Sequence, residues 1–228
     1  MAKDIKVLLN KATAITKKKR AFAKKVKKEL YTFPTDVNYV LGIDPGLTGA
    51  VCFMHRNGNN EKVQVIELED CPLTQGGLTK KDQINPNSKT YDLFKMYTSI
   101  TRFKKLAFED NSTLFAFIEK SQAMSKGRRA QGAVSNFTIG YGYGLWLMAL
   151  AGNQVPYFSF APRTWTSTLF PKESEYYTLE GKARSIAFSQ AHYPTAPLVP
   201  DRPRCRAIKD GRADAICIAH YGVHQYLS

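Results

Sequence analysis

The amino-acid sequence predicts an α/β protein in which helices flank a mixed sheet of five strands, preceded by a basic helical extension. Strand-like segments come first as a run of three and afterwards alternate with helix-like segments. This order requires antiparallel and parallel neighbours within one sheet. Of the 228 residues, 43% are hydrophobic and 12% are aromatic, which is enough to build one α/β core and excludes a largely disordered chain.

Residues 1–33 are predicted to form the basic amphipathic extension. Apolar residues recur there at helical spacing, and eleven of the 33 Lys and Arg residues lie in residues 1–30 beside only two acidic ones. That segment therefore holds +9 of the formal charge of +14. Its helix could dock on the main domain, self-associate or fold on a phosphate backbone, and a Lys-rich transit peptide is a further alternative.

The main domain is expected to span residues 34–228 and to begin at Pro34, which ends the helical pattern. Residues 37–44 are apolar and rich in β-forming side chains, so they predict the first strand. Residues 49–56 and 61–69 flank a hairpin-type NGNN turn and predict two further strands that run antiparallel. A meander of three strands therefore opens the domain.

Helices and strands alternate after this meander. The polar, Gly- and Asn-rich residues 71–89 predict a loop, residues 90–106 a helix and residues 114–119 the fourth strand. The fifth strand is predicted at 155–161, and the remaining helices at 137–152, 163–170, 179–191 and 211–226. This succession completes the mixed sheet and its helical cover.

Charge and cysteine content indicate the partner and the compartment. The net charge of +14 favours a polyanion, and nucleic acid fits better than a membrane because no lipidation motif and no run of about 18 apolar residues is present. Solubility alone is the simpler explanation of the charge. The four cysteines show no C-x-x-C pairing, so we expect them to be reduced and structural, in an intracellular, reducing compartment.

Asp44 lies at the end of the first predicted strand, within GIDPGLTGA. Val40, Gly42 and Asp44 share one face of that strand, so Gly42 is expected to leave open space beneath the carboxylate. A turn aspartate before Pro45 and Gly46 is the structural alternative. In either role, Asp44 ends a strand of the sheet.

Glu119 closes the fourth strand, after Phe115 and Phe117 on the same face. An unpaired carboxylate at the end of an apolar strand is costly, so we expect a cation as its partner, and a structural salt bridge to Lys or Arg would satisfy that need. If the first and fourth strands are parallel neighbours, about 4.8 Å apart, the side chains of Asp44 and Glu119 converge.

Asp210 and Asp214 lie in KDGRADAICIAHYG, one helical turn apart and on one face if the helix includes both. Asp210 could instead be the N-cap of that helix, a role that needs no chemistry. An acid in the first turn is also favoured by the helix dipole. Asp214 is therefore the stronger functional candidate of the two.

The four carboxylates together predict a metal centre. Clustered carboxylates raise one another's pKa and need a divalent cation between them to ionise together. Oxygen ligands select Mg²⁺ or Mn²⁺, and a site with two such ions would activate water and stabilise the leaving oxygen in phosphodiester cleavage. The four histidines are scattered and form no zinc motif. The predicted catalytic and metal-binding residues are Asp44, Glu119, Asp210 and Asp214.

Five segments, in order, resemble the motifs of RuvC-type Holliday-junction resolvases, in particular those of phages and plant chloroplasts. They are GIDPGLTGAV with Asp44, FIEKSQAM with Glu119, FTIGYGYGLWLMAL, RTWTSTL, and KDGRADAICIAHYG with Asp210 and Asp214. The resemblance covers residues 37–224. It implies a ribonuclease-H-like fold, the four acids as metal ligands, and a crossover junction endodeoxyribonuclease of DNA recombination and repair. Such an enzyme is a homodimer that makes paired symmetric nicks in a four-way DNA junction.

Two positions depart from the pattern of that family. The family tends to have a lysine just after the tryptophan that corresponds to Trp165, and this chain has Thr166 there. Lys182 or Arg163 could supply the missing cation. The last two acids are also further apart than in bacterial members, so Asp210 is either a ligand or only a helix cap.

Basic and aromatic residues around the motifs are predicted to bind DNA. Basic clusters follow the fourth strand and adjoin the last acids, where they would bind phosphate without reading sequence. Nearby aromatic rings could stack on exposed junction bases or pack in the core, and Gly140, Gly142 and Gly144 could let a helix start approach a strand or a phosphate closely. The predicted DNA-binding residues are Lys126, Arg128, Arg129, Tyr141, Tyr143, Lys182, Arg206, Lys209 and Arg212.

Two other function classes fit part of the sequence. DPGLTG loosely matches the strand-turn-strand of the actin-like ATP-binding fold, although that fold needs a second phosphate motif and usually two such domains. A non-catalytic nucleic-acid-binding protein on the same fold would keep the basic clusters but would have no use for four convergent acids. Metal-dependent nicking of a four-way junction distinguishes the three functions.

Overall fold

The computed structural model describes residues 37–56, 63–78, 84–121, 132–201 and 205–227. The extension predicted for residues 1–33, the NGNN turn, and the basic residues Lys126, Arg128 and Arg129 lie outside the described residues. The fold and the candidate site are therefore those of the α/β domain alone.

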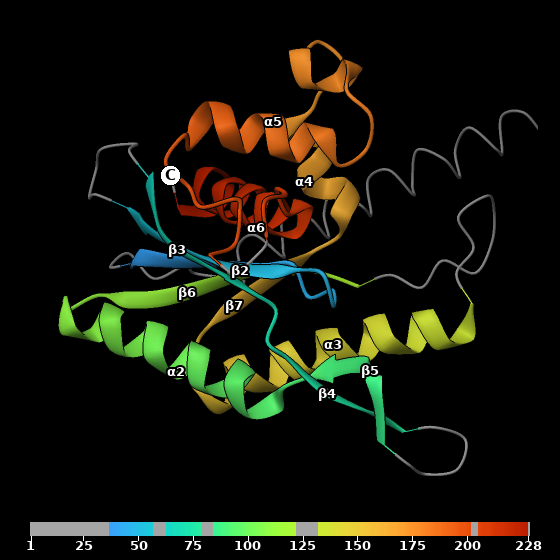
Figure 1. The fold of residues 1–228 in the computed structure, drawn as a ribbon. Coiled ribbons are helices and arrows are strands. Elements are labelled where there is room, and N and C mark those ends of the chain that lie inside the picture. The colour runs from blue at the N-terminus through green and yellow to red at the C-terminus, as the bar shows by residue number, and fades with distance from the viewer. Residues whose placement is uncertain (1–36, 57–62, 79–83, 122–131, 202–204, 228) are drawn as a thin grey trace, which may run out of the picture. The chain divides into compact units, whose positions relative to one another are not determined.

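A five-stranded mixed sheet forms the centre of this domain (Figure 1). Its strands are β1 (Val37–Ile43), β2 (Ala50–Arg56), β3 (Val63–Asp70), β6 (Thr113–Glu119) and β7 (Tyr157–Phe160). They lie side by side in the order β3, β2, β1, β6, β7. Antiparallel pairing joins β1 to β2 and β2 to β3, whereas β6 runs parallel to both β1 and β7. The predicted mixed sheet of five strands is thus confirmed.

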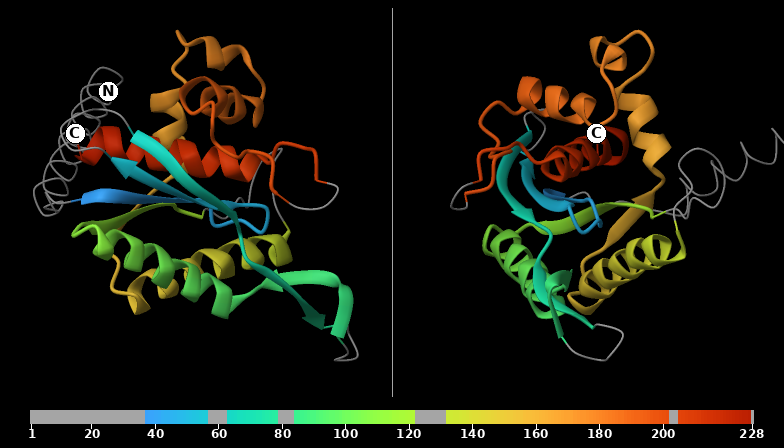
Figure 2. Two further views of the ribbon diagram at one scale, coloured as in Figure 1. Left: turned by 60° about the vertical axis from the view of Figure 1, so that its left-hand side comes forward. Right: turned by 45° about the vertical axis from the view of Figure 1, so that its right-hand side comes forward.

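Helices cover both faces of the sheet. They are α2 (Leu93–Glu109), α3 (Ala133–Gly152), α4 (Pro162–Leu169), α5 (Ala183–His192) and α6 (Asp210–Gly222), with short helical turns η1 (Glu175–Thr178) and η2 (Val223–Leu227). Figure 2 shows α2 and α3 on one side of the sheet and α4, α5 and α6 on the other. Helix α6 packs directly on β1, β2 and β6, and α4 and α5 pack on α6.

Side-chain alternation along the strands divides the interior between the two helical layers. Leu41 and Ile43 of β1 and Ile118 of β6 belong to the large apolar core beneath α2 and α3. Phe103 from α2 and Trp146 from α3 fill that core and are fully buried. Each such side chain stabilises the fold by about 1.5–3 kcal/mol. The residues between them along β1 and β6 face α6.

Helix α6 crosses β1 so closely that only glycine fits at the crossing. A Cβ atom on Gly42 would lie 2.2 Å from the carbonyl oxygen of Ala215 and 2.6 Å from the Cβ atom of Ala219. The space next to Gly42 is therefore filled by α6, and the expectation of open space beneath Asp44 is wrong. Gly42 instead sets the distance between α6 and the sheet, because it lacks a side chain.

Strands β4 (Leu73–Leu78) and β5 (Ile84–Tyr91) form a separate two-stranded antiparallel ribbon. The loop predicted for residues 71–89 is therefore wrong. Gly, Asn and Pro lower the intrinsic strand preference of this segment, but the two strands pair with each other. Figure 1 shows this ribbon beyond the edge of the central sheet, beside α3.

Helix α3 starts earlier than the sequence predicts, at Ala133. Gly140, Gly142 and Gly144 consequently lie in its middle, and the expectation that they mark a helix start is wrong. Only Gly142 is in a tight contact, because a Cβ atom there would lie 2.1 Å from the Tyr91 hydroxyl, whereas Cβ atoms on Gly140 and Gly144 would meet nothing within 4 Å. Within the described residues, no helix has the length and apolar character needed to cross a membrane.

Candidate active site

Asp44 lies in the tight turn between β1 and β2. Its backbone N–H donates to the carbonyl oxygen of Ala50 at 3.0 Å, and the N–H of Gly49 donates to the carbonyl oxygen of Gly46 at 2.9 Å. The carboxylate accepts a hydrogen bond from the Gly46 N–H through Oδ1, at 3.2 Å. The turn role that the sequence left open is thus present, and it fixes the orientation of the carboxylate.

Glu119 is the last residue of β6 and leaves the sheet beside Asp44. The parallel register pairs Ile43 with Ile118, so the residues that follow them lie at the same edge of two adjacent strands. Glu119 accepts a hydrogen bond through Oε2 from the indole Nε1–H of Trp165 in α4, at 2.6 Å. Among the described residues the partner of Glu119 is therefore an indole, which neutralises no charge, and the alternative of a structural salt bridge to Lys or Arg is not formed.

Asp210 is the first residue of α6, and the N-cap is Lys209. The alternative that Asp210 caps the helix is therefore wrong. A backbone bridge joins Gly49 of the β1–β2 turn to Gly211, and this bridge holds the start of α6 against the turn that carries Asp44.

Lys182, just before α5, brings a positive charge to the carboxylates. It forms an ion pair with Asp210, and this hydrogen-bonded contact, ahead of the charges of Asp214 and Asp44, raises the pKa of Lys182. Of the two basic residues considered as the cation of this site, Lys182 is the one that contacts an acid. Asp214 lies one turn further along α6 and is half-buried.

Burial and mutual repulsion change the protonation of the acids. Burial raises the pKa of Asp44 to about 8, and the charges of Asp214 and Glu119 add to the shift. Burial raises the pKa of Glu119 to about 7, against the hydrogen bond from Trp165 that favours its ionised form. The pKa of Asp214 rises to about 6, chiefly through burial. These carboxylates therefore lie close enough to act on one another, as their predicted convergence requires.

The donor chemistry of this cluster fits a hard divalent cation. All its donors are carboxylate oxygens, which Mg²⁺ and Mn²⁺ prefer, and a positive ion would relieve the repulsion that helps to raise the pKa values. The present rotamers do not form a ligand shell, since no group of three or more His, Cys, Asp or Glu side chains in the described part of the chain is arranged as around a metal ion.

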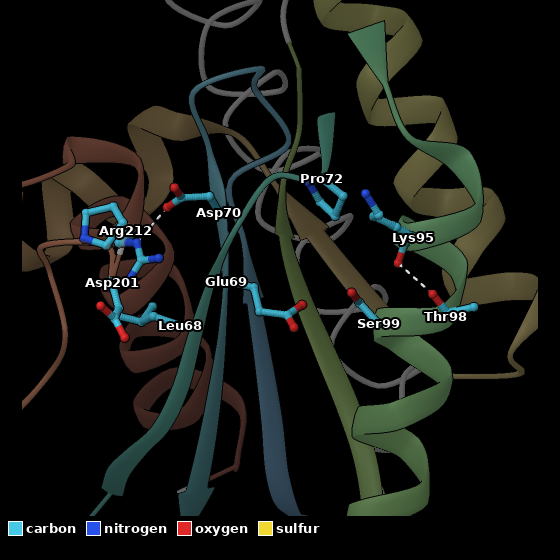
Figure 3. Close-up of a pocket in the computed structure, with 10 residues that line it drawn as sticks. Leu68, Glu69, Asp70, Pro72, Lys95, Thr98, Ser99, Asp201 and Arg212 are labelled. Carbon is cyan, nitrogen blue, oxygen red and sulfur yellow. Dashed lines mark hydrogen bonds and ion pairs between the residues drawn. The ribbon is translucent and has the colours of Figure 1, made fainter. Parts of the chain in front are cut away.

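The basic residues near α6 occupy different environments. Arg212 is only 7% exposed, and its guanidinium donates to Asp70 Oδ1 and to the carbonyl oxygen of Pro197, both at 2.6 Å. Figure 3 shows Arg212 beside Asp70 at one wall of a pocket whose other wall includes residues of α2. Arg212 thus ties α6 to β3, a placement that does not favour the predicted phosphate contact. Arg206 is exposed and Lys209 half-buried.

The two tyrosines predicted to contact DNA also lie in different environments. Phe137 and Tyr141 are 73% and 43% exposed on α3, and their rings are nearly parallel with centroids 6.0 Å apart. Tyr143 packs against the apolar core instead. Tyr141 is therefore accessible to a ligand, whereas Tyr143 packs in the core, which was the alternative left open for these aromatic residues.

Two residues that sequence reasoning did not assign to the site support it. Trp165 binds Glu119, and Tyr91 at the end of β5 donates from its hydroxyl to the carbonyl oxygen of Pro45, at 3.2 Å. Trp165 lies in the RTWTSTL motif, and its membership of that motif was a sequence signal that could have assigned it to the site. No local signal connects Tyr91 to the β1–β2 turn, because the two segments meet only in the folded chain.

No protein-family model and no curated protein matches this chain. Solved structures do match it. RuvC of Thermus thermophilus in complex with a Holliday junction substrate shares 14% identity, covers 83% of this chain and 94% of its own, and has a TM-score of 0.50. A second structure of Thermus thermophilus RuvC has 14% identity, coverage of 81% and 93%, and a TM-score of 0.47. The yeast mitochondrial Holliday junction resolvase Ydc2 has 16% identity, coverage of 85% and 80%, and a TM-score of 0.45.

The first of these similarities establishes the fold. Its alignment extends over most of both chains, and the mixed five-stranded sheet flanked by helices is the architecture predicted from the sequence. The ribonuclease-H-like fold predicted from the resemblance is therefore confirmed.

Proposed function

We propose that this protein is a metal-dependent endonuclease that resolves four-way DNA junctions by paired symmetric nicks. The observation behind the proposal is the convergence of acids from the ends of β1 and β6 and from α6. The RuvC whose fold the chain shares was solved in complex with a Holliday junction substrate. A protein that only binds a polyanion has no use for clustered carboxylates, because they repel phosphate.

The metal ligands in this proposal come from the acids at the end of the sheet. Two divalent ions per site, Mg²⁺ or Mn²⁺, would be held by these acids, and when bound they would supply an activated water and stabilise the leaving oxygen of the phosphodiester. The Trp165 indole and the Gly46 N–H hold the carboxylates of Glu119 and Asp44. Such hydrogen bonds favour the ionised form and orient the ligand. The proposed ligands are Asp44, Glu119, Asp210 and Asp214.

Lys182 is proposed to take the place of the lysine that the resolvase motif has at the position of Thr166. Its ammonium group contacts Asp210 and would face a phosphodiester bound at the carboxylates. A fixed positive charge at that place stabilises the negative charge that develops during cleavage. Lys182 therefore has a catalytic role in the proposal as well as a binding role.

The remaining DNA contacts are proposed for exposed basic and aromatic residues. Arg206 and Lys209 adjoin the first turn of α6, and Tyr141 extends from α3 beside the similarly exposed Phe137. The ammonium and guanidinium groups would bind phosphates, and the aromatic rings would stack on bases opened at the branch point. Lys126, Arg128 and Arg129, which lie outside the described residues, belong to the same proposal.

The active species is proposed to be a homodimer, because two symmetry-related cuts need two equivalent sites. Helix α3 offers further apolar surface for such an association, with Val134 and Met148 exposed by 81% and 50%. Light scattering of the full chain, free and on junction DNA, should show two chains. A monomer under both conditions would contradict the dimer.

Residues 1–30 are proposed to add sequence-independent phosphate contacts, because they hold much of the positive charge. Each phosphate that a protein neutralises steepens the log–log salt dependence of binding by about 0.9 on duplex arms. Deletion of the segment should therefore flatten the slope and weaken binding, with cut positions unchanged. A truncated chain that keeps the slope but becomes monomeric or insoluble would identify a packing helix instead.

One cleavage assay tests the proposed function. The full chain is incubated with labelled four-way, Y-shaped and linear DNA of the same sequence, with Mg²⁺, with Mn²⁺ or with EDTA. We expect paired cuts at symmetric positions in the four-way junction, only with a divalent ion. Binding without cutting would favour the non-catalytic nucleic-acid-binding protein, and ATP hydrolysis without cutting would favour the actin-like alternative.

A further inference from the structure

The β4–β5 ribbon is attached to the turn that carries Asp44. On the β4 side, the Cys71 N–H donates to the carbonyl oxygen of Gly49 at 2.9 Å. On the β5 side, the Tyr91 hydroxyl donates to the carbonyl oxygen of Pro45 at 3.2 Å. The segment just before β4 and the last residue of β5 therefore both contact the β1–β2 turn, so the base of the ribbon has a fixed position relative to the carboxylates.

A groove of about 500 Å³ lies between this ribbon, the β1–β2 turn and the start of α6. The turn contributes residues 47–49, and α6 contributes Asp210 together with its cap, Lys209. The ribbon contributes Lys89 and Gln75, which are directly paired across its two strands and therefore extend from the same face of the ribbon. Because Asp210 is one of the four acids, the groove is continuous with the candidate active site.

Positive charge lies on two of the three walls of the groove. Lys89 is exposed and Lys209 half-buried, and within the described part of the chain neither ammonium group forms an ion pair. Each of the two carboxylates in the lining is paired with a cation, Asp210 with Lys182 and Asp70 with Arg212. Two uncommitted cations beside an acid cluster suit a ligand that is a chain of anions, with one phosphate at the acids and its neighbours along the groove.

We propose that this groove binds the cleaved DNA strand next to the cut, with Lys89 and Lys209 on phosphates that flank the cleaved phosphodiester. The inference rests on the proposed function, and it assigns the β4–β5 ribbon a role in substrate binding. The ribbon and the β1–β2 turn both line the groove in which the strand would lie. Lys89 is the residue that distinguishes this site from the basic cluster near α6.

The first test compares Lys89→Gln and Lys209→Gln with Lys105→Gln in the full chain. Lys105 is exposed on α2, where it pairs with Glu109, so its variant matches the loss of charge at a place outside the groove. Binding of an uncut junction in EDTA is measured across a range of salt concentrations. Each groove variant should flatten the log–log salt slope by about 0.9 and bind several-fold more weakly at moderate salt, and Lys105→Gln should change neither.

The second test locates the contact on the DNA. Single phosphates near the cut are replaced by neutral methylphosphonates, and binding is measured for the wild type and for Lys89→Gln. At the contacted phosphate, neutralisation should weaken the wild type but cause no further loss in Lys89→Gln. Additive losses at every position, or an unchanged salt slope in Lys89→Gln, would overturn the groove proposal. A wild type that cuts no junction would overturn the proposed function instead, so the two failures are distinguishable.

Discussion

The two faces of the central sheet are packed in different ways. Beneath α2 and α3, large side chains such as Phe53, Phe103 and Trp146 form a continuous apolar core. Across the other face, α6 approaches β1 over Gly42 until backbone and small side chains are in contact. All four acids lie on the α6 side or at the edge of the sheet beside it.

The two faces therefore have different roles. The core beneath α2 and α3 stabilises the fold, and the α6 contact fixes the geometry of the acids. An apolar core depends on volume and tolerates substitutions that conserve it. The α6 contact depends on the distance between backbones, which places Asp214 relative to Asp44 and Glu119. Substitutions on the two faces should therefore have different consequences even where their cost in stability is the same.

The largest effect is expected from removing the acids of the α6 side. Asp44→Asn and Glu119→Gln keep the shape of the side chain but remove a metal ligand. Loss of even an outer partner of a metal ligand typically costs about 10- to 100-fold, so cleavage should fall by more than about 100-fold. Junction binding, measured by gel shift, should remain because it depends on Lys and Arg.

A combined loss of binding and cleavage, with the fold intact by circular dichroism, would assign Asp44 and Glu119 to structure instead. Glu67→Gln is the matched control. Glu67 pairs with Arg102 on the surface of the α2 side, so its variant should keep both binding and cleavage.

A smaller effect is expected for Trp165→Phe, which keeps an aromatic ring but removes the N–H that binds Glu119. Without that hydrogen bond the pKa of Glu119 should rise further above its ordinary value. Cleavage at pH 7 should fall by about 10- to 100-fold and recover partly at higher pH. A uniform loss at every pH would show that Trp165 acts only through packing.

Gly42→Ala and Phe103→Leu compare the two faces at similar cost. The first forces a Cβ atom against Ala215 and the second leaves a small void beneath α2. Each should lower the free energy of unfolding by about 1–3 kcal/mol in denaturant titrations. Gly42→Ala should also lose most cleavage below its melting temperature, because α6 is displaced. Equal cleavage in the two variants would remove the distinction between the faces.

The smallest effect concerns stability without divalent ions. The pKa of Asp44 is raised to about 8 in the folded chain. The contribution of its protonated carboxyl group to the free energy of unfolding is therefore fully present at low pH and is lost as pH rises through that value. Between pH 7 and 8 the loss is at most about 1 kcal/mol. Asp44→Asn should make this dependence smaller in thermal melts in EDTA, with Glu119 supplying the remainder. An unchanged pH profile would contradict the burial of a protonated Asp44.

Much of the fold was predictable because its signals are local. The apolar runs of β1, β2 and β6 and the helical patterns are visible in the sequence, and their order demands a mixed sheet. The convergence of Asp44 and Glu119 followed once two strand ends were assigned to parallel neighbours. Cys52, Cys71 and Cys217 are buried and free, as expected for structural cysteines.

Tertiary contacts decided the features that the sequence did not reveal. The ribbon forms because two weak strands pair with each other, and Gly42 admits a helix that lies far away in the chain. Arg212 is buried because Asp70, distant in sequence, accepts its guanidinium. In each case the partner is separated from the residue by a turn or by whole elements, so no local pattern could identify it.

The most direct test of the central claim measures metal binding together with proton release. Mn²⁺ is titrated calorimetrically into the full chain at pH 7, in two buffers of different ionisation enthalpy. The pKa of Asp44 is about 8 and that of Glu119 about 7, so at pH 7 Asp44 is largely protonated and Glu119 is partly protonated. Metal binding must therefore displace protons. We predict binding with net proton release in the wild type, and weaker binding with less release in Asp44→Asn. A wild type that binds no Mn²⁺, or an Asp44→Asn variant with unchanged affinity and proton release, would contradict the account.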